Sequence, residues 1–389
     1  MNILMVHPHD LFSKEEPWTT RIRNIAAEFK KKGHAVKIVY FPLKYKAHQQ
    51  RFFIGGIEYI PLSRRVGVLP LIRNIGFLRK ECADADIIHF QKCFYHAALP
   101  ALIAAFLGNK PIHYDWDDWE IKIFHCSGRQ PRLVGVFLSA WERLVPLLCD
   151  TVSVSSMRLR EECINYGVAR ERIASAPVGA DLEVFHPAIS GLFVRERYNI
   201  IEEPLVSYIG QLHGGQYAEQ FIRAAKIVLN RISSVKFMVV GGGYRLEELK
   251  KMARDLALDG SVVFTGAVTH QEVPLYMAAT DIAVACFEDN DITRCKSPLK
   301  IAEYMAGGKA IVASDVGEVK RMIGGAGFLT APGDSQVLAQ GILKLLDDEP
   351  LRKRLALKAR QRAEEQFNWA NTAENLLKVY KISLNNVKK

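Results

Sequence analysis

The sequence has few of the features that mark a disulfide-stabilised, zinc-binding or membrane-spanning protein. Its 389 residues include seven cysteines, scattered between Cys82 and Cys295, with no Cys-x-x-Cys pair. This pattern indicates neither a disulfide framework nor a structural zinc site. The longest apolar runs, such as 97–107, are shorter than the roughly 20 residues that span a bilayer. The start of the chain lacks a basic leader, so we expect no signal peptide and a cytoplasmic protein.

Acidic residues are scarce in one stretch, and that stretch accounts for the net charge of +10. Between Lys30 and Lys80 there are twelve Lys and Arg residues and one acidic residue, Glu58. On anionic lipid headgroups each basic side chain contributes about 1 kcal/mol. No nucleic-acid-binding module accompanies the stretch, so we expect no nucleic-acid partner. Residues 30–80 therefore predict either a surface that rests on the inner face of the cell membrane or an ordinary solvated basic face.

Short apolar runs alternate with amphipathic segments along the chain, which is typical of parallel sheets with helical crossovers. The predicted strands are 3–6, 35–41, 85–90, 111–114, 151–155, 205–209, 236–240, 261–264, 282–285 and 310–313. A polar passage near 187–203 separates two series of strands. We therefore expect two Rossmann-like α/β domains, 1–190 and 191–370, facing each other across a cleft. A C-terminal helix, 371–389, should pack back toward the first domain.

Four passages of the second half occur in a specific order. They are Val206–Gly210, Phe237–Gly243, Val262–Val268 and Ser297–Ala310, and looser matches in the first half include Gly33-His34 and Ile87–His89. Together they resemble glycosyltransferase family 4, the retaining "glycosyl transferases group 1". The resemblance implies the GT-B fold, with the acceptor bound by the N-terminal domain and a nucleotide-sugar donor by the C-terminal domain.

Residues suited to a nucleotide diphosphate gather around Ser297. Ser297 can cap a helix that Pro298 and Leu299 open, where free amides and the helix dipole favour an anion. The positive charges near this helix start are Arg294, Lys296 and Lys300. Glu303 follows on the same helical face, and the resemblance implies that it accepts hydrogen bonds from ribose hydroxyls. Without the resemblance, Lys300 and Glu303 would be read as a surface ion pair. The resemblance also places donor-binding turns at Gly210, Gln211, Gln216, Gly241 and Gly266.

Three positions depart from the family pattern. Cys295 stands where the family usually has a glutamate near the donor sugar. Gln211 and Gln216 stand where an arginine and a lysine usually grip the diphosphate, and an uncharged amide binds phosphate more weakly. Arg294 and Lys296 can compensate from the other side. These departures support a second hypothesis, that the protein is a catalytically impaired nucleotide-sugar-binding protein. A third hypothesis is another GT-B activity, such as that of an epimerase.

In the first half, the strand 111–114 leads into a motif rich in carboxylates and tryptophans. Asp117 and Asp118 can hydrogen-bond sugar hydroxyls or stabilise an oxocarbenium-like transition state, while Trp116 and Trp119 can stack on sugar rings. The adjacent aspartates also suit a metal ion, but the resemblance implies a metal-independent enzyme, so we expect no metal and no cofactor.

The loop after the first strand has no glycine that would let the backbone approach a phosphate closely. It carries Trp18, Thr19, Thr20 and Arg21 at a helix start instead. These residues can bind the acceptor or a phosphate, although Thr19 can equally be a simple cap.

The resemblance implies retaining transfer from a UDP- or GDP-sugar to a hydroxyl of a glycan or lipid-linked acceptor, in cell-envelope polysaccharide or glycolipid synthesis. The departing diphosphate would help deprotonate that hydroxyl, so no side-chain nucleophile is required.

Overall fold

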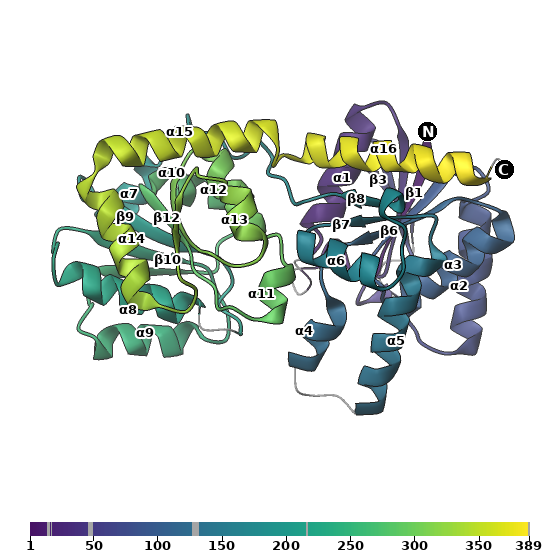
Figure 1. Ribbon diagram of the computed structural model, residues 1–389, viewed down its shortest axis with the longest axis horizontal. Helices are drawn as coiled ribbons and strands as arrows, with labels where there is room; N and C mark the ends of the chain where they lie inside the picture. The colour runs from purple at the N-terminus through teal and green to yellow at the C-terminus, as the bar shows by residue number, and fades with distance from the viewer. Residues whose placement is uncertain (14–15, 17, 46–49, 127–131, 215–216, 388–389) are drawn as a thin grey trace. The chain divides into compact units, whose positions relative to one another are not determined.

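The computed structural model describes the chain except residues 14–15, 17, 46–49, 127–131, 215–216 and 388–389 (Figure 1). It divides into two compact units. Unit 1 comprises Met1–Pro177 and Trp369–Lys389, and unit 2 comprises Val178–Asn368. The chain thus leaves unit 1 earlier than the expected boundary after residue 190, and it returns at Trp369 rather than at residue 371.

Unit 1 is built on an eight-stranded sheet of order β3-β4-β2-β1-β5-β6-β7-β8. Only the β3–β4 pair is antiparallel among its neighbours. The strands are β1 (Asn2–His7), β2 (Ala35–Tyr40), β3 (Phe52–Ile54), β4 (Ile57–Pro61), β5 (Ile87–Gln91), β6 (Ile112–Trp116), β7 (Thr151–Val154) and β8 (Ile173–Ser175). The helices are α1 (Thr20–Lys31), α2 (Val68–Glu81), α3 (Tyr95–Gly108), α4 (Glu120–Cys126), α5 (Arg132–Leu148), α6 (Met157–Asn165) and α16 (Trp369–Val387). Residues of β5, β6 and β7 are all buried, as expected of strands covered on both faces.

Unit 2 is built on a six-stranded parallel sheet of order β11-β10-β9-β12-β13-β14. The strands are β9 (Leu205–Ile209), β10 (Lys236–Val240), β11 (Val262–Gly266), β12 (Ile282–Ala285), β13 (Ala310–Ser314) and β14 (Phe328–Thr330). The helices are α7 (Leu192–Arg197), α8 (Tyr217–Leu229), α9 (Leu246–Asp255), α10 (Val273–Ala279), α11 (Asp291–Cys295), α12 (Leu299–Ala306), α13 (Glu318–Ile323), α14 (Ser335–Asp347) and α15 (Glu349–Glu365). Two apolar clusters form its core, one on each face of the sheet.

The two α/β units confirm the fold class expected from the sequence. The hydrophobic periodicity of the sequence did not predict the β3–β4 hairpin or α2, which lie largely inside the basic stretch 30–80. The hairpin turns at Gly55 and Gly56, whose φ angles of 58° and 75° favour glycine. Its strands, of three and five residues, are too short to show a clear alternation.

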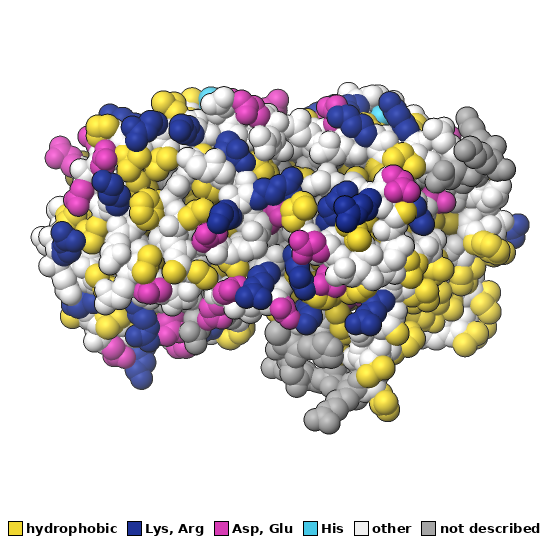
Figure 2. Space-filling model, in the orientation of Figure 1, with side chains coloured by type: hydrophobic (Ala, Val, Ile, Leu, Met, Phe, Trp, Pro, Cys, Tyr) yellow, Lys and Arg dark blue, Asp and Glu magenta, His cyan; other side chains and the backbone are white. Residues whose placement is uncertain are grey.

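Apolar side chains are exposed on several helices of unit 1. Figure 2 shows hydrophobic side chains gathered over the region of α2, α3 and α5. The most exposed on these helices are Phe106, Leu133, Leu69 and Val68, at 85%, 83%, 75% and 73%. No helix in the described part of the chain is long and apolar enough to cross a bilayer.

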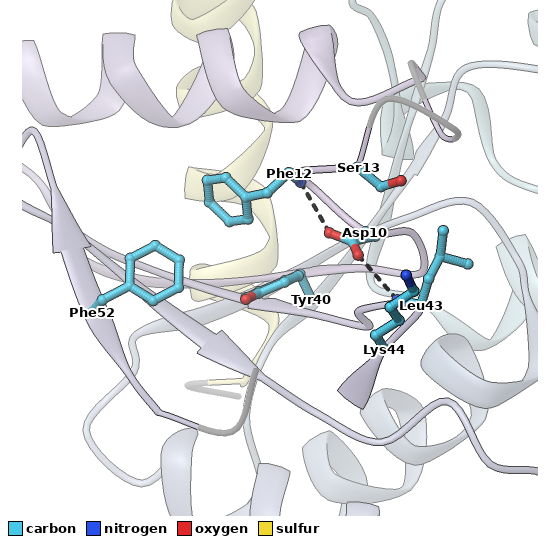
Figure 3. A pocket seen from close by; sticks show the side chains of 7 residues that line it. All are labelled: Asp10, Phe12, Ser13, Tyr40, Leu43, Lys44 and Phe52. Carbon is cyan, nitrogen blue, oxygen red and sulfur yellow. Dashed lines mark hydrogen bonds between the residues drawn. The ribbon is translucent and has the colours of Figure 1, made fainter. Parts of the chain in front are cut away.

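A pocket of about 340 Å³ lies in unit 1 where β1 and β2 end (Figure 3). The loop after β1 contributes Asp10, Phe12 and Ser13, and the end of β2 contributes Tyr40. Leu43, Lys44 and Phe52 complete the lining. Aromatic and polar side chains at this edge of the sheet therefore line an open space beside the strand ends.

Candidate functional site

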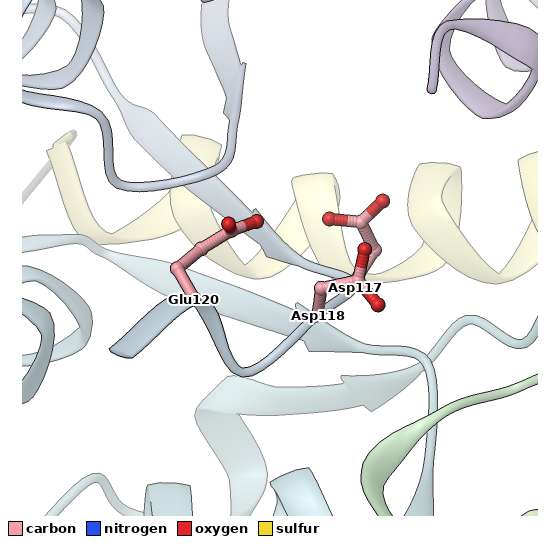
Figure 4. Close-up of side chains that lie close together, drawn as sticks. All are labelled: Asp117, Asp118 and Glu120. Carbon is pink, nitrogen blue, oxygen red and sulfur yellow. The ribbon is translucent and has the colours of Figure 1, made fainter. Parts of the chain in front are cut away.

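At the carboxyl ends of β5 and β6, unit 1 gathers three carboxylates around one ammonium group. Asp117 and Asp118 follow β6, and Glu120 begins α4 (Figure 4). Nζ of Lys92 lies 3.3 Å from Oδ1 of Asp117, 3.0 Å from Oδ2 of Asp118 and 2.7 Å from Oε1 of Glu120. The Lys92 side chain is only 4% exposed. The cluster therefore contains its own counter-ion.

Lys92 occupies an unusual backbone conformation. Its φ angle is 63°, in the left-handed region that costs a non-glycine residue about 1–3 kcal/mol. The turn brings its ammonium beneath the end of β6, where the ion pairs offset that strain. Beside it, Nε2 of Gln91 donates a hydrogen bond of 2.7 Å to Oδ2 of Asp117. Oδ1 of Asp117 and Oε1 of Gln91 are buried without a hydrogen-bond partner in the described structure.

The same carboxylates have the spacing of a cation site. One oxygen of each of Asp117, Asp118 and Glu120 lies within 4.8 Å of the others, close enough to share a divalent ion. The ammonium of Lys92 lies among these oxygens and already supplies positive charge there. The ammonium of Lys92 therefore offsets part of the negative charge of these carboxylates.

Burial shifts the protonation equilibria of this cluster. Burial opposes the charge of Lys92, but Asp117, Asp118 and Glu120 outweigh it and hold the pKa of Lys92 well above its usual value. Burial raises the pKa of Glu120 to about 7, with nearby Asp118 and Asp117 adding to the effect. Burial also raises the pKa of Glu142 to about 8. Lys92 is therefore charged at neutral pH, where Glu120 titrates.

The sequence suggested that Arg21 could bind a phosphate or the acceptor. In the structure its guanidinium is instead paired inside unit 1. Its Nε and Nη2 atoms each donate to Asp115, both at 2.7 Å, and Nη2 also donates to the Ala176 carbonyl. Ser153 donates a third hydrogen bond to Asp115. Because Arg21 is 5% exposed and Asp115 fully buried, the pair joins α1 to β6 inside the unit rather than presenting a phosphate site.

The tryptophans differ in their access to a ligand. Trp116 is fully buried, and its ring lies between those of Tyr114 and Tyr166, at 6.2 and 5.8 Å between centroids. It therefore has no face for a sugar ring, contrary to the prediction, because β6 directs it into the core. Trp119 is 8% exposed, with Lys122 and Arg158 over its ring.

The predicted residues of the loop after β1 lie at the surface or at the start of α1. Trp18 is 52% exposed, whereas Thr19 is buried. Thr19 is the N-cap residue of α1, but its side chain makes no capping hydrogen bond. Thr20 is the first residue of that helix.

In unit 2, three turns at the carboxyl ends of neighbouring strands approach one another closely. Gly210 follows β9 and donates to the Val240 carbonyl, while Gly241 follows β10 and donates to the carbonyl of Gly266. A Cβ atom on Gly241, whose φ is 145°, would lie 1.9 Å from the Gly210 oxygen. Glycine is therefore required for the backbones to approach here.

Helix α12 brings Lys300 and Glu303 to the same edge. Nζ of Lys300 lies 4.1 Å from the ring centroid of Tyr208 and 5.8 Å from that of Phe287. Burial lowers the pKa of Lys300 to about 8. Burial raises the pKa of Glu303, which is 8% exposed, to about 8 against the opposing charge of Lys300. Neither side chain makes a hydrogen bond to another described residue.

The start of α12 differs from the prediction by one residue. Pro298 is the N-cap residue, without a side-chain capping hydrogen bond, and Leu299 opens the helix. Ser297 instead accepts a hydrogen bond from the Val178 amide at 3.3 Å. Ser297 thus fastens the segment before the helix, because its hydroxyl faces the backbone of residue 178.

The remaining donor-site predictions lie near this helix or outside the described residues. Arg294 belongs to α11 and forms an exposed, bidentate ion pair with Asp289, at 2.6 and 2.9 Å. Lys296 is partly buried, Gln211 is exposed and Cys295 is buried. Gln216 lies outside the described residues.

The sequence did not reveal Gln91, Lys92 and Glu120 as members of the unit 1 cluster. The only available signal is position, since Gln91 and Lys92 come at the end of a buried strand that neighbours β6. Carboxyl ends of neighbouring parallel strands meet at one edge of a sheet.

Two Rossmann-like units with polar residues at their strand ends define the GT-B class of glycosyltransferases. Among solved structures, Anabaena HepE in complex with UDP and glucose matches with a TM-score of 0.76. The match covers 98% of this chain and 100% of that one at 18% identity. At this identity the likeness concerns the fold.

The chain belongs to the group 1, or family 4, glycosyltransferases. Residues 203–348 match the family model "Glycosyl transferases group 1" and residues 19–184 match "Glycosyltransferase Family 4". The α-D-kanosaminyltransferase of Streptomyces kanamyceticus is 27% identical over 48% of this chain, and the match spans only about half, 48%, of that relative. A phosphatidyl-myo-inositol mannosyltransferase of Mycolicibacterium smegmatis is 23% identical over 98% of this chain and 93% of its own length.

Proposed function

We propose that this protein is a retaining glycosyltransferase that moves a sugar from a nucleotide diphosphate sugar to a hydroxyl of a glycan or lipid-linked acceptor. One observation carries the proposal. The side chains of Lys300 and Glu303 lie together at the carboxyl edge of the unit 2 sheet without hydrogen bonds to other described residues. The free amides of α12, with Lys300 and Lys296, would bind the diphosphate, and Glu303 would accept hydrogen bonds from the ribose.

The donor is a UDP- or GDP-sugar in this proposal. The likeness to a fold that binds UDP and glucose in HepE supports a nucleoside diphosphate ligand. The glycine turn at Gly210 lies against α12, since a Cβ atom on Gly210 would lie 2.6 Å from Nζ of Lys300. Gln211 adds neutral donors where the family has charge, so Lys300, Lys296 and Arg294 carry the electrostatic part of phosphate binding.

In the transfer step, the bond between the sugar C1 and the diphosphate breaks as the acceptor oxygen bonds to C1. The proton of the acceptor hydroxyl passes to the leaving diphosphate. Asp117 and Asp118 would hydrogen-bond the donor sugar or stabilise positive charge that develops on its ring. Lys92 holds these carboxylates in place and supplies the positive charge in their midst, so the proposed reaction needs no metal ion and no cofactor.

We also propose that the acceptor is met at an anionic membrane surface, in cell-envelope polysaccharide or glycolipid synthesis. The exposed face of α2 and the residues before it supports this proposal. Val66, Val68 and Leu69 are at least 73% exposed, and Arg65 and Arg73 are exposed beside them. We expect flotation with vesicles containing phosphatidylglycerol, and its loss in an Arg65→Glu/Arg73→Glu variant. Equal flotation of both proteins would contradict the membrane proposal.

A calorimetric titration with UDP, GDP, ADP, dTDP and CMP tests the donor site. We expect one nucleoside diphosphate to bind selectively, and Glu303→Ala to weaken it strongly. Glu247→Ala, a change at an exposed position of α9, serves as the matched control. Unchanged binding by Glu303→Ala would contradict the site. Binding without sugar transfer to any acceptor would favour the impaired nucleotide-sugar-binding protein, and interconversion of the donor without an acceptor would favour an epimerase.

A further inference from the structure

We propose that the pocket lined by Phe12, Tyr40 and Phe52 binds a sugar ring of an oligosaccharide acceptor, at a distance from the hydroxyl that reacts. The inference rests on the proposed function and names the class of acceptor. It assigns a role to a pocket that belongs neither to the carboxylate cluster of unit 1 nor to the donor site of unit 2.

One side of the pocket is aromatic. The Phe12 ring lies 5.4 Å from the ring of Tyr40 and 5.2 Å from that of Phe52, measured between centroids. Tyr59 stacks on Phe52 from behind, at 5.5 Å with an interplanar angle of 10°. Phe12 nevertheless remains 41% exposed. The Phe12 ring also lies 5.3 Å from the ring of Tyr59, and the Arg23 guanidinium lies 5.8 Å from its centroid. The part of this ring that stays open to solvent is suited to stacking against a ligand.

The other side of the pocket is largely polar. Figure 3 shows the rings of Phe12, Tyr40 and Phe52 together, and Asp10, Ser13, Leu43 and Lys44 across from them. A pyranose has the matching character, with C–H bonds on its ring face and hydroxyls around its edge. A lipid chain would leave the polar side unsatisfied, and Lys44 alone provides little charge for the phosphates of a nucleotide.

The pocket is held open by its own framework. Oδ1 of Asp10 accepts a hydrogen bond from the Phe12 amide, and Oδ2 accepts one from the Leu43 amide, both at 3.0 Å. The Asp10 amide in turn donates to Glu16, which also pairs with Arg64. The loops after β1 and β2 are thus tied together before a ligand arrives, which lowers the entropic cost of binding.

The strand order separates this pocket from the reacting centre. The pocket lies at the ends of β1 and β2, and the carboxylate cluster at the ends of β5 and β6. With neighbouring strands about 4.8 Å apart, two strand spacings give about 10 Å between the two places. A single sugar cannot occupy both places, so the pocket suits a sugar residue further along the acceptor. Binding energy from such a remote residue can be used to orient the reacting hydroxyl.

Saturation-transfer NMR with the methyl pyranosides of glucose, galactose, mannose and N-acetylglucosamine tests the proposal. We expect at least one to bind the intact protein, and to bind at least tenfold more weakly to Phe12→Ala and Phe52→Ala. Phe53→Ala is the matched control, because Phe53 is the next residue of β3, points to the opposite face and is 70% exposed. It should bind like the unchanged protein.

Nucleotide titrations of the same variants separate the two proposals. All of them should bind the nucleoside diphosphate in unit 2 with unchanged affinity, and an unfolding midpoint like that of the unchanged protein, followed by a probe in unit 1, should show that unit 1 is folded. The pocket proposal is overturned if no pyranoside binds, or if Phe12→Ala and Phe52→Ala bind as well as Phe53→Ala. If the unchanged protein binds a pyranoside but no nucleoside diphosphate, that result would instead contradict the proposed function.

Discussion

The two units place polar groups at the same edge of their sheets but treat charge in opposite ways. In unit 1 the charges satisfy one another, as Lys92 contacts three carboxylates and Arg21 pairs with Asp115. In unit 2 Lys300 and Glu303 lie three residues apart on α12, and no described residue hydrogen-bonds to the side chain of either. The charges of Lys92 and Arg21 in unit 1 are therefore compensated by carboxylates, whereas burial shifts the pKa of both Lys300 and Glu303 in unit 2 to about 8.

Burying a charged side chain costs free energy in both units, but a compensating interaction can form at different stages. A buried ion pair is compensated on folding, and removing one partner leaves an uncompensated charge. Buried charges without such partners destabilise the free protein and are compensated when a ligand binds, which is typical of functional sites. The difference leads to contrasting expectations for substitutions in the two units.

The largest expected effect is that of Lys92→Met. Removing the ammonium leaves three carboxylates close together and largely buried, which should destabilise unit 1 by about 3–5 kcal/mol. The loss should shrink as the pH falls, because protonation relieves the repulsion. Urea unfolding at pH 5 and pH 8 measures both effects.

Lys31→Met provides the matched control for that prediction. Lys31 is 61% exposed in its ion pair with Glu28, so its loss should change stability by less than about 1 kcal/mol. Equal effects of the two substitutions would mean that the carboxylate cluster does not depend on Lys92.

The second expected effect concerns the pH dependence of stability in unit 2. The folded-state pKa of Glu303 is raised to about 8 by burial, above its value of about 4.3 in an unfolded chain. The folded state therefore holds the proton more tightly, and stability from this group falls as the pH rises from about 5 to about 8. Within that window each pH unit costs up to about 1.4 kcal/mol.

Glu303→Gln should remove this pH dependence. The stability difference between the variant and the unchanged protein should grow in favour of the variant from pH 5 to pH 8 and then level off. Chemical unfolding followed by a probe in unit 2 measures it. Parallel pH profiles for both proteins would show that Glu303 is not held in a site that disfavours its charge.

A third, smaller effect is expected for Gly241→Ala. The added Cβ would overlap the Gly210 oxygen, so the turns must move apart, at about 1–3 kcal/mol of stability and with weaker nucleotide binding. Gly260→Ala is the control, since Gly260 also has a positive φ, of 75°, but no atom within 4 Å of the added carbon. The variant at Gly260 should lose stability without losing nucleotide affinity.

The smallest effect on stability is expected for Arg294→Ala. The exposed pair with Asp289 should contribute less than about 1 kcal/mol. If Arg294 assists phosphate binding as proposed, nucleotide affinity should fall while the unfolding midpoint stays the same. Unchanged affinity would remove Arg294 from the donor site and leave the work to Lys296 and Lys300.

The sequence predicted unit 2 more closely than unit 1. Strands 205–209, 236–240 and 282–285 match β9, β10 and β12 residue for residue, because each is a short, largely apolar and buried run between turns. The hairpin β3–β4 was missed, because its strands are three and five residues long and sit among charged residues. The periodicity of the chain contains little information about such edge strands.

The site residues were predictable only as far as local motifs reach. Lys300 and Glu303 share one helix, so their proximity follows from spacing alone. Lys92 and Asp117 come from different strands, and only the strand order brings them together. For Trp116 the local motif was misleading. It suggested a contact with a ligand, but the ring points from β6 into the core.

The return of the chain to unit 1 has a consequence for how the protein is made. Helix α16 supplies Tyr380, which bonds to His89 at 2.6 Å, and Ser383, which bonds to Thr151 at 2.6 Å. On the ribosome, residues 178–368 form a continuous block that can fold as soon as it has emerged. Unit 1 starts first but must wait with these buried groups uncovered until residues 369–387 have followed. The first unit to be synthesised is thus the last to be completed.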